Sequence, residues 1–310
     1  MQLQMENIRK NFRDKEVLKG ITVRMENGVY GLLGPNGAGK TTMIRILADI
    51  LQPSEGRVLI NGQDKNTCGD DYRAKIGYLP QDMHFYADFS GLDYLQYVAA
   101  LKGIPPAAAK TRIDELAASV GLSGDVRRRC VHYSGGMKRR LGIAQALLND
   151  PHILILDEPT AGLDPQERIK FRNIISAFSK DRIVLLSTHI VSDVDSIAKE
   201  IMMMEYGSIR KPQAGEEYIR LIENRVWTFQ IPVNDLIVYQ HNAVISNVVP
   251  RGKNMEVRVI DDEKPNADAV PVPPNLEDAY LYIFNYLPGK YRGGHTAASG
   301  RTNSLSADYD

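Results

Sequence analysis

Several features are scarce in this 310-residue sequence, and each scarcity excludes a class of protein. Its two cysteines, Cys68 and Cys130, form no CxxC pair or Cys/His cluster, which argues against a disulfide framework or a zinc site. No secretory h-region follows Met1, so we expect a reduced, cytosolic environment. A membrane-spanning helix needs about 20 apolar residues. The most apolar stretches, 94–101 and 279–287, are much shorter, and the sequence therefore predicts no bilayer-spanning segment.

Charge of one sign is also lacking. The 38 lysines and arginines balance 38 aspartates and glutamates, so no overall field attracts nucleic acid or anionic lipid. Basic residues do gather at 127–129 and 138–140, but acidic residues offset them elsewhere, and we interpret them as a solvated face. We therefore expect no nucleic-acid partner. The hydrophobic content of 43% is enough for one large domain and a smaller one.

The N-terminal part of the chain has the order strand, loop, helix. Short apolar segments between residues 3 and 33 are separated by polar turns and resemble strands. A glycine-rich loop follows, and after it Ile44, Leu47 and Leu51 repeat at helical spacing until Pro53 ends the pattern. This is the order that phosphate-binding loops require.

The middle of the chain predicts a helical insert and then a βαβ unit. We expect helix over most of 84–129, interrupted by glycine and proline at 103–106. Residues 153–156 and 183–187 are rich in β-branched residues and leucine, which is typical of parallel strands buried on both faces. Because 166–178 has a helical period between them, we predict a parallel sheet and an α/β fold.

The character of the sequence changes after about residue 212, where we predict a domain boundary. Residues 1–212 would form one domain, with a helical subdomain at about 84–135. Strand-like and helix-like segments alternate in 213–287 and predict a small α+β accessory domain, in which we find no chemical motif. Residues 288–310 are rich in glycine, serine, threonine and alanine, and predict a disordered tail.

The glycine-rich loop has the pattern G-x-x-x-x-G-K-T. Its glycines allow backbone N–H groups to converge on phosphate oxygens, because a β-carbon would block the approach and the φ values that it requires. Lys40 would pair with the β- and γ-phosphates, and the Thr41 hydroxyl would ligate Mg²⁺. The sequence therefore predicts a P-loop in which the following residues bind the nucleotide: Gly34, Pro35, Asn36, Gly37, Ala38, Gly39, Lys40, Thr41 and Thr42.

Two adjacent carboxylates end the apolar strand 153–156. A buried strand has no structural use for charges at its tip, so a functional role is the simpler interpretation. Asp157 is placed to hold Mg²⁺ as a Walker B aspartate, and Glu158 can polarise the water that attacks the γ-phosphate. We therefore predict that Glu158 takes part in hydrolysis, together with Lys40.

A Tyr-Ser-Gly-Gly-Met-Lys segment begins another predicted helix. It resembles the signature of the ATP-binding-cassette (ABC) family, which is usually written LSGGQ. Ser134, Gly135 and Gly136 would form an anion site at the helix N-terminus. In the family, this site closes on the γ-phosphate that the opposite subunit holds. Tyr133 and Met137 differ from the leucine and glutamine that are commonest at these positions of the signature. We expect this difference to distinguish the subfamily more than to change the activity.

Four further residues match the family's motifs in the family's order. Gln81 resembles the Q-loop glutamine, which senses Mg²⁺ and lies where the membrane subunit docks. Asp164 ends a segment similar to the D-loop, which crosses the dimer interface. His189 resembles the switch histidine that contacts the γ-phosphate, and Phe12 stands where the family has an aromatic ring against adenine. Each match is weak alone, but together they extend the resemblance over about residues 2–210.

The resemblance implies a P-loop NTPase fold with an ABC-type β-subdomain and an α-helical signature insert. It also implies ATP and Mg²⁺ as ligands and ATP hydrolysis as the activity. Because the P-loop and the signature of one chain cannot meet in this fold, two copies would face head to tail. The other partner would be a membrane-spanning permease, which would hold the chain at the cytoplasmic side of the membrane. The signature's wording and the late helix 276–287 resemble bacterial exporters whose ATPase and permease are separate polypeptides.

A second hypothesis stays open, in which the chain is a soluble ABC ATPase that acts on ribosomes or nucleic acid. Such proteins usually carry two cassettes, or long coiled-coil, zinc-binding or basic inserts, and the sequence has none of these. The transported molecule is selected mainly by the permease, so the sequence does not name it.

Overall fold

The computed structural model describes residues 1–86 and 88–286. Contacts divide this part of the chain into two compact units, Met1–Pro212 and a second that begins at Gln213. The tail predicted at 288–310 lies outside the described residues, as does residue 287, where the predicted last helix ends. None of the helices in the described ranges has both the length and the hydropathy that crossing a membrane requires.

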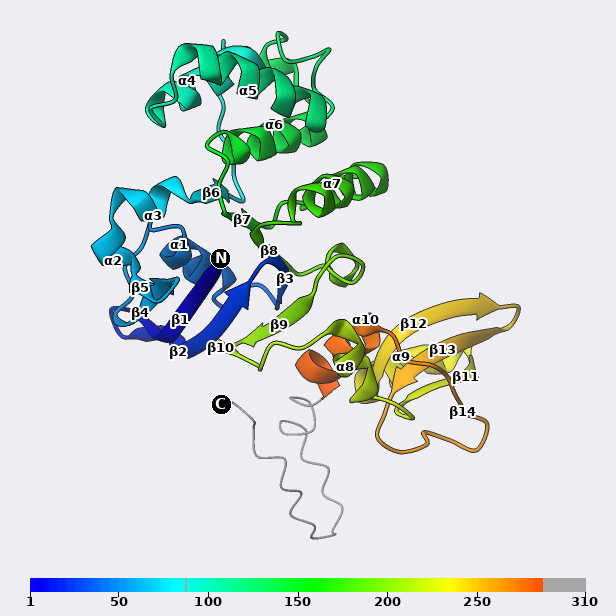
Figure 1. The fold of residues 1–310 in the computed structure, drawn as a ribbon. Coiled ribbons are helices and arrows are strands. Elements are labelled where there is room, and N and C mark those ends of the chain that lie inside the picture. Colours follow the sequence, from blue (N-terminus) through cyan, green and yellow to red (C-terminus); the bar gives the residue numbers. More distant parts are fainter. Residues whose placement is uncertain (87, 287–310) are drawn as a thin grey trace. The chain divides into compact units, whose positions relative to one another are not determined.

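A six-stranded sheet forms the centre of the first unit, with the order β10-β9-β3-β8-β7-β6 (Figure 1). All neighbouring strands in it are parallel except β10 and β9. The parallel sheet predicted from 153–156 and 183–187 is therefore confirmed, and the carboxyl ends of its strands meet at one edge. Its strands are β3 (Gly28–Leu33), β6 (Ile76–Leu79), β7 (Ile153–Asp157), β8 (Ile183–Thr188), β9 (Glu200–Glu205) and β10 (Ser208–Ile209).

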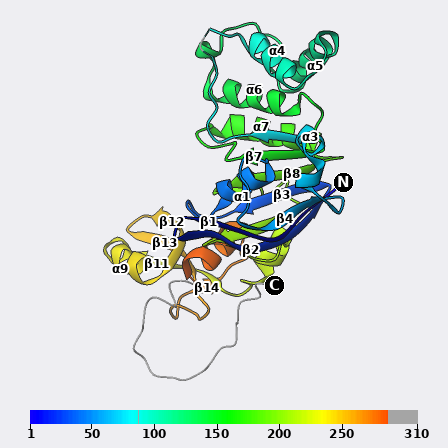
Figure 2. The same ribbon diagram turned by 90° about the vertical axis from the view of Figure 1, so that its left-hand side faces the viewer.

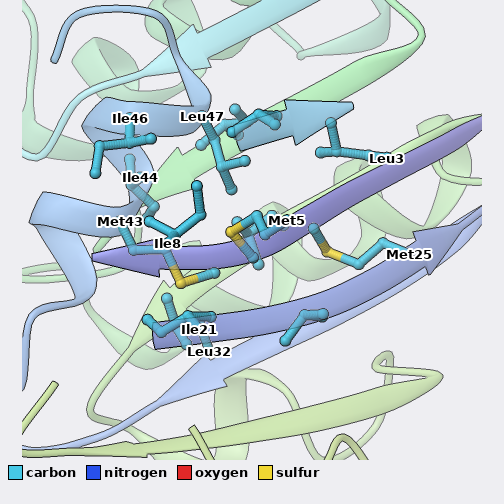
Figure 3. Close-up of a cluster of buried hydrophobic side chains, with 14 of the residues drawn as sticks. Leu3, Met5, Ile8, Ile21, Met25, Leu32, Met43, Ile44, Ile46 and Leu47 are labelled. Carbon is cyan, nitrogen blue, oxygen red and sulfur yellow. The ribbon is translucent and has the colours of Figure 1, made fainter. Parts of the chain in front are cut away.

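An antiparallel sheet of order β2-β1-β4-β5 completes the β structure of this unit. Apolar side chains of β1 and β2 pack with Leu32 of β3 and with one face of α1 in a fully buried cluster (Figure 3). This packing fixes α1 directly behind the glycine-rich loop. The elements are β1 (Gln2–Phe12), β2 (Lys15–Glu26), β4 (Glu55–Ile60), β5 (Gln63–Asp64) and α1 (Lys40–Leu47).

The helical insert is shorter than the sequence predicts. In the described part of 84–129 the α-helices are α4 (Gly91–Leu101) and α5 (Pro106–Ser119), with the predicted interruption at 103–106 between them, and the described residues on either side of this pair are not α-helical. Gly121, with φ 68°, follows α5 and ends its helical path. Helices α4, α5 and α6 lie together in both views (Figure 2). The remaining α-helices of the unit are α2 (Lys65–Cys68), α3 (Asp70–Ala74), α4 (Gly91–Leu101), α5 (Pro106–Ser119), α6 (Gly135–Leu147) and α7 (Pro165–Phe178).

The second unit has an antiparallel sheet of order β12-β13-β11-β14. Its core joins Phe229 and Ile231 of β11 to Val257 and Val259 of β13. The helix predicted from 276 onward begins at Leu276 and is capped by Asn275, whose side chain accepts a hydrogen bond from the Asp278 N–H in a capping box. The elements are α8 (Gly215–Arg220), β11 (Val226–Pro232), α9 (Leu236–Asn242), β12 (Val244–Arg251), β13 (Asn254–Ile260), β14 (Val270–Pro271), α10 (Leu276–Leu281) and a π-helix (Tyr282–Tyr286).

Candidate functional site

The glycine-rich loop joins β3 to α1, and two of its glycines have no room for a side chain. A β-carbon on Gly34 would lie 2.3 Å from the carbonyl oxygen of Met204 in β9. Gly39 has φ 112°, and a β-carbon there would also lie 3.0 Å from Leu18. Only glycine permits this path, which holds the loop close against the sheet and turns it into the N-terminus of α1.

A cavity of about 390 Å³ opens above this loop. Its volume is within the range of small-molecule sites. Segments that are far apart in the sequence meet around it: the loop with the start of α1, the end of β6 and the end of β7. The lining residues are Val17, Asn36, Gly37, Gly39, Lys40, Thr41, Thr42, Gln81 and Glu158.

Lys40 carries the positive charge of the cavity, and its side chain is 6% exposed. Its Nζ donates hydrogen bonds to the carbonyl oxygens of Gly34, at 2.7 Å, and Pro35, at 3.3 Å. The same nitrogen lies 3.3 Å from Glu158 Oε1. The ammonium is therefore held at the point where the loop faces the acidic end of β7.

Asp157 is buried at the end of β7 with one oxygen satisfied and one free. Its Oδ1 accepts hydrogen bonds from Ser187 Oγ at 2.7 Å and from Thr41 Oγ1 at 3.4 Å. Its Oδ2 has no hydrogen-bond partner among the described residues. Burial raises the pKa of Asp157, while the bonds from Ser187 and Thr41 act to lower it. A free carboxylate oxygen beside a threonine hydroxyl is a donor set that suits Mg²⁺, which prefers oxygen ligands.

Glu158 follows Asp157 with an unusual backbone. Its φ is 46°, a left-handed conformation that is uncommon for a residue with a side chain. The Glu158 N–H donates to Ser187, at 2.9 Å to Oγ and 3.2 Å to the carbonyl oxygen, which holds this turn. On the side chain, Oε2 lies 2.8 Å from His189 Nδ1. The carboxylate thus lies between the Lys40 ammonium and the His189 ring.

Gln81 and Phe12, predicted from the resemblance, have different positions. Gln81 comes two residues after β6 and lines the cavity. Phe12 ends β1 with 47% of its surface exposed, and its ring lies 5.2 Å from Lys10 Nζ. Phe12 is not among the described residues that line the cavity, whereas Val17, which the sequence analysis missed, is. Val17 is one of several apolar residues that alternate with polar ones in β2, so the sequence does not show that it, rather than another of them, lines the cavity.

The residues of the signature segment are at the start of α6 and do not line the cavity. Ser134 Oγ accepts a hydrogen bond from the Met137 N–H at 3.2 Å and caps the helix. A β-carbon on Gly136 would lie 2.3 Å from Glu167 Oε2 of α7, whereas one on Gly135 would have no neighbour within 4 Å. The face at Gly135 is therefore open, and in both views α6 lies away from α1 (Figures 1 and 2).

Asp164 and Arg139 connect this region to its surroundings. Asp164 caps α7 by accepting a hydrogen bond from the Glu167 N–H at 2.9 Å. Arg139, on α6, donates to the carbonyl oxygen of Pro80 at 3.2 Å, and burial lowers its pKa. Because Pro80 directly precedes Gln81, this bond ties the signature helix to the segment that lines the cavity.

The sequence analysis also missed Ser187, which bonds to Asp157 and Glu158. The sequence signal was a serine and a threonine at the end of the apolar run of β8, and in the parallel register Ser187 lies opposite Asp157. A polar side chain that is 0% exposed at that level has to serve a polar neighbour.

Comparisons with known proteins give the same picture throughout. A family model described as ABC transporter matches residues 18–161. The chain is 36% identical over 230 residues to the uncharacterized ABC transporter ATP-binding protein YxlF of Bacillus subtilis, covering 74% of this chain and 76% of YxlF. It is 30% identical over 300 residues to the Nod factor export ATP-binding protein I of Burkholderia orbicola, covering 91% and 96%. Among solved structures, cbiO1 of Clostridium perfringens, part of the transporter complex cbiONQ, superposes with a TM-score of 0.63 at 26% identity, covering 71% and 94%.

Proposed function

The chain belongs to the ABC transporter family and is an ATP-binding subunit that hydrolyses ATP to drive transport, and we propose that it does so through the cavity residues described above. One observation carries the assignment of residues. Lys40 begins α1, whereas the adjacent residues Asp157 and Glu158 come from the end of β7, yet their charged groups are buried close together. Lys40 and Glu158 line the cavity, and Asp157 bonds to Thr41, which also lines it. Burying charges together is costly unless a function requires it.

The loop 34–39 and the N-terminus of α1 would bind the phosphates of ATP. Backbone N–H groups and the helix dipole favour negative charge at this point. The Lys40 ammonium, now bonded to two loop carbonyls, would turn toward the β- and γ-phosphates, which are stronger partners because they are charged. Val17 is the apolar residue on the cavity wall and offers a surface for the nucleotide.

Thr41, Asp157 and Gln81 would hold Mg²⁺. The free Oδ2 of Asp157, the Thr41 hydroxyl beside it and the amide of Gln81 support this assignment, since all three supply oxygen. Mg²⁺ would neutralise charge on the phosphate oxygens. Ser187 would keep Asp157 oriented by its 2.7 Å hydrogen bond to the other carboxylate oxygen.

Glu158 would act as the general base that takes a proton from the attacking water. Glu158 lines the cavity, and its Oε1, which lies 3.3 Å from Lys40 Nζ, accepts no hydrogen bond from the described residues, which suits that role. The bond between Oε2 and His189 Nδ1 would fix the carboxylate's orientation. His189, with 45% of its side chain exposed, would also be free to reach the γ-phosphate.

ATP-binding subunits of this family dimerise and work with membrane permease components. We propose the head-to-tail form for this chain, in which Ser134, Gly135 and Gly136 of one copy, with Asp164, face the γ-phosphate held by the other. The open face at Gly135 and its separation from the chain's own cavity support this arrangement. A dimer would then have two complete sites.

The proposed direction of transport is export. The support is a relative whose name is Nod factor export ATP-binding protein I and which the chain matches over 96% of that relative's length. Subunits of this family are associated with membranes, and we propose that this one lies at the cytoplasmic face, bound to its permease. The alternative of an ATPase acting on ribosomes or nucleic acid has no support from the relatives described above, which carry transporter names.

Replacement of Lys40 tests the proposed site. We expect Lys40→Ala to lose at least about 100-fold in ATP hydrolysis, because one positive group at the phosphates is removed. Phosphate release from MgATP measures the loss. Lys180→Ala changes an exposed lysine and should keep the activity of the unmodified chain. If Lys40→Ala hydrolyses ATP as fast as that control, the assignment of the cavity is wrong.

A further inference from the structure

The proposed general base and the histidine beside it lie on two different loops, and the side chain of Asp193 joins these loops. Glu158 follows β7, whereas His189 follows β8. The hydroxyl of Thr160, two residues after Glu158, donates to Asp193 Oδ2, and Thr188 Oγ1, next to His189, donates to the same oxygen at 3.3 Å. We infer that Asp193 is a positioning residue for the Glu158–His189 pair, an inference that rests on the proposed function.

Burial shows how specific this arrangement is. The side chains of Thr160, Thr188 and Asp193 are each 0% exposed. Asp193 Oδ1 has no hydrogen-bond partner among the described residues, so the carboxyl group is only half satisfied. Burying a carboxyl oxygen that has no hydrogen-bond partner costs free energy, and an apolar side chain would fill the same space without that cost. The hydrogen bonds that Asp193 accepts from the hydroxyls of Thr160 and Thr188 are therefore the reason to have a carboxyl group at this position.

The loop after β7 needs such support because its backbone starts in an uncommon conformation. Glu158 has φ 46°, and only Ser187 holds its N–H. Beyond it the chain turns, with hydrogen bonds from the Ala161 N–H to the Glu158 carbonyl at 3.3 Å and from the Leu163 N–H to the Thr160 carbonyl at 3.1 Å. Those bonds are internal to the loop. Apart from the contact between Glu158 and His189 themselves, the Thr160 side chain links this turn to the loop of His189.

The loop after β8 is arranged around the same carboxyl group. Thr188 Oγ1 accepts a hydrogen bond from the Ile190 N–H at 3.0 Å, and the Asp193 N–H donates to the Ile190 carbonyl at 3.1 Å. Asp193 thereby lies at the end of a short 3-10 helix, Val191–Asp193, that follows His189 by one residue. Fixing both loops to one oxygen keeps Glu158 Oε2 and His189 Nδ1 at 2.8 Å.

Loss of this link should slow hydrolysis without weakening ATP binding. Small displacements of a reacting group reduce rates by up to about 100-fold. We expect Thr160→Val, which keeps the volume of the side chain, to lower kcat about 10- to 100-fold. KM for ATP should stay within about threefold, since uniform binding is unaffected. Thr160→Ser, which keeps the hydroxyl, should restore kcat to near that of the unmodified chain.

Steady-state hydrolysis of MgATP by the full chain tests these expectations, with Asp193→Ala and the double variant Thr160→Val/Asp193→Ala measured beside them. Because both residues act through one bond, the double variant should be little slower than Asp193→Ala. Asp195→Asn removes an exposed carboxylate two residues away and is the matched control. A kcat for Thr160→Val equal to that control, a loss confined to KM, or no rescue by serine would overturn the inference.

A parallel measurement separates this inference from the proposed function. Glu158→Gln should abolish turnover; if it keeps the kcat of the unmodified chain, the proposed general base is wrong. If Glu158→Gln is inactive while Thr160→Val and Asp193→Ala turn over normally, only the role of Asp193 is wrong. Should Asp193→Ala fail to fold, the comparison of valine with serine at position 160 decides the question.

Discussion

The two units of the chain each bury carboxyl groups, but they satisfy them differently. In the second unit Asp278 is 1% exposed, and Arg258 binds both of its oxygens, with a closest contact of 2.6 Å. The Asn275 N–H adds a further bond at 2.9 Å. In the first unit Asp157 is equally buried, yet one of its oxygens has no partner among the described residues.

This difference separates a structural role from a functional one. Asp278 joins β13 to the start of α10 and closes its own network, so nothing is left over for a ligand. Asp157 Oδ2 and Glu158 Oε1 have no hydrogen-bond partner among the described residues; Glu158 lines the cavity, and Asp157 bonds to Thr41, which also lines it. This arrangement weakens the fold unless a bound partner completes it. At Asp157 and Glu158 it is the combination of an unsatisfied buried oxygen with a neighbouring cavity that indicates the site.

Between these two buried aspartates, the larger effect on hydrolysis should come from removing the charge of Asp157. We expect Asp157→Asn to lower kcat for MgATP hydrolysis by about 10²–10³-fold, because a fixed charge at the proposed Mg²⁺ site is lost. The unfolding of the second unit, followed by the fluorescence of Trp227, the chain's single tryptophan, should not change. Asp181→Asn removes an exposed carboxylate near β8 as a control. Full activity in Asp157→Asn would show that Asp157 has no functional role that distinguishes it from Asp278.

Asp278→Ala should have the opposite pattern. We expect it to destabilise the second unit by about 3 kcal/mol, because Arg258 is left without its buried partner. Urea unfolding monitored at Trp227, which lies in β11 of the same sheet, measures this. ATP hydrolysis per folded molecule should be unchanged. Glu277→Gln, which alters the exposed neighbour, is the control. A loss of hydrolysis with unaltered unfolding would show that the second unit also has a catalytic role.

The pH dependence of stability gives the smallest effect. Burial raises the pKa of Asp157 in the folded protein, so the folded state binds its proton more tightly than the unfolded state. As pH rises through the interval between the unfolded and the folded pKa, ionisation favours unfolding and stability falls. Asp157→Asn cannot ionise and should lack this fall. Its stability relative to the unmodified chain should therefore increase from about pH 4 to pH 7 in urea unfolding; a constant difference would contradict the argument.

Much of the fold and of the site could be predicted from local sequence patterns, because these features are determined by residues that are neighbours in the sequence. The loop 34–39 is specified by its glycines, and the strand β7 by its continuous apolar run. The position of Val17 at the cavity and the pairing of Ser187 with Asp157 depend instead on which strands pair and in what register, and the polar end of β8 does not by itself identify that partner. The excess helix predicted toward residue 129 has a local cause, since Gly121 adopts a left-handed conformation directly after α5 and the chain beyond it is not helical.

Phe12 illustrates the limit of carrying a motif over by position. An aromatic residue near the end of β1 was expected against adenine, but its ring is exposed and close to Lys10. Whether the ring meets the nucleotide depends on the hairpin turn between β1 and β2, whose register shifts at several points. The assignment of Phe12 remains a prediction, for which nucleotide affinity of Phe12→Ala is the measurement.

The most direct test concerns the claim that two copies complete each other's sites. Glu158→Gln keeps the shape of the site and should bind ATP without hydrolysing it, which traps the closed state. Size-exclusion chromatography with saturating ATP and Mg²⁺ should give a dimer, and without ATP a monomer. The double variant Lys40→Ala/Glu158→Gln should stay monomeric under both conditions. If Glu158→Gln is monomeric with saturating ATP and Mg²⁺, the account of the shared site is contradicted.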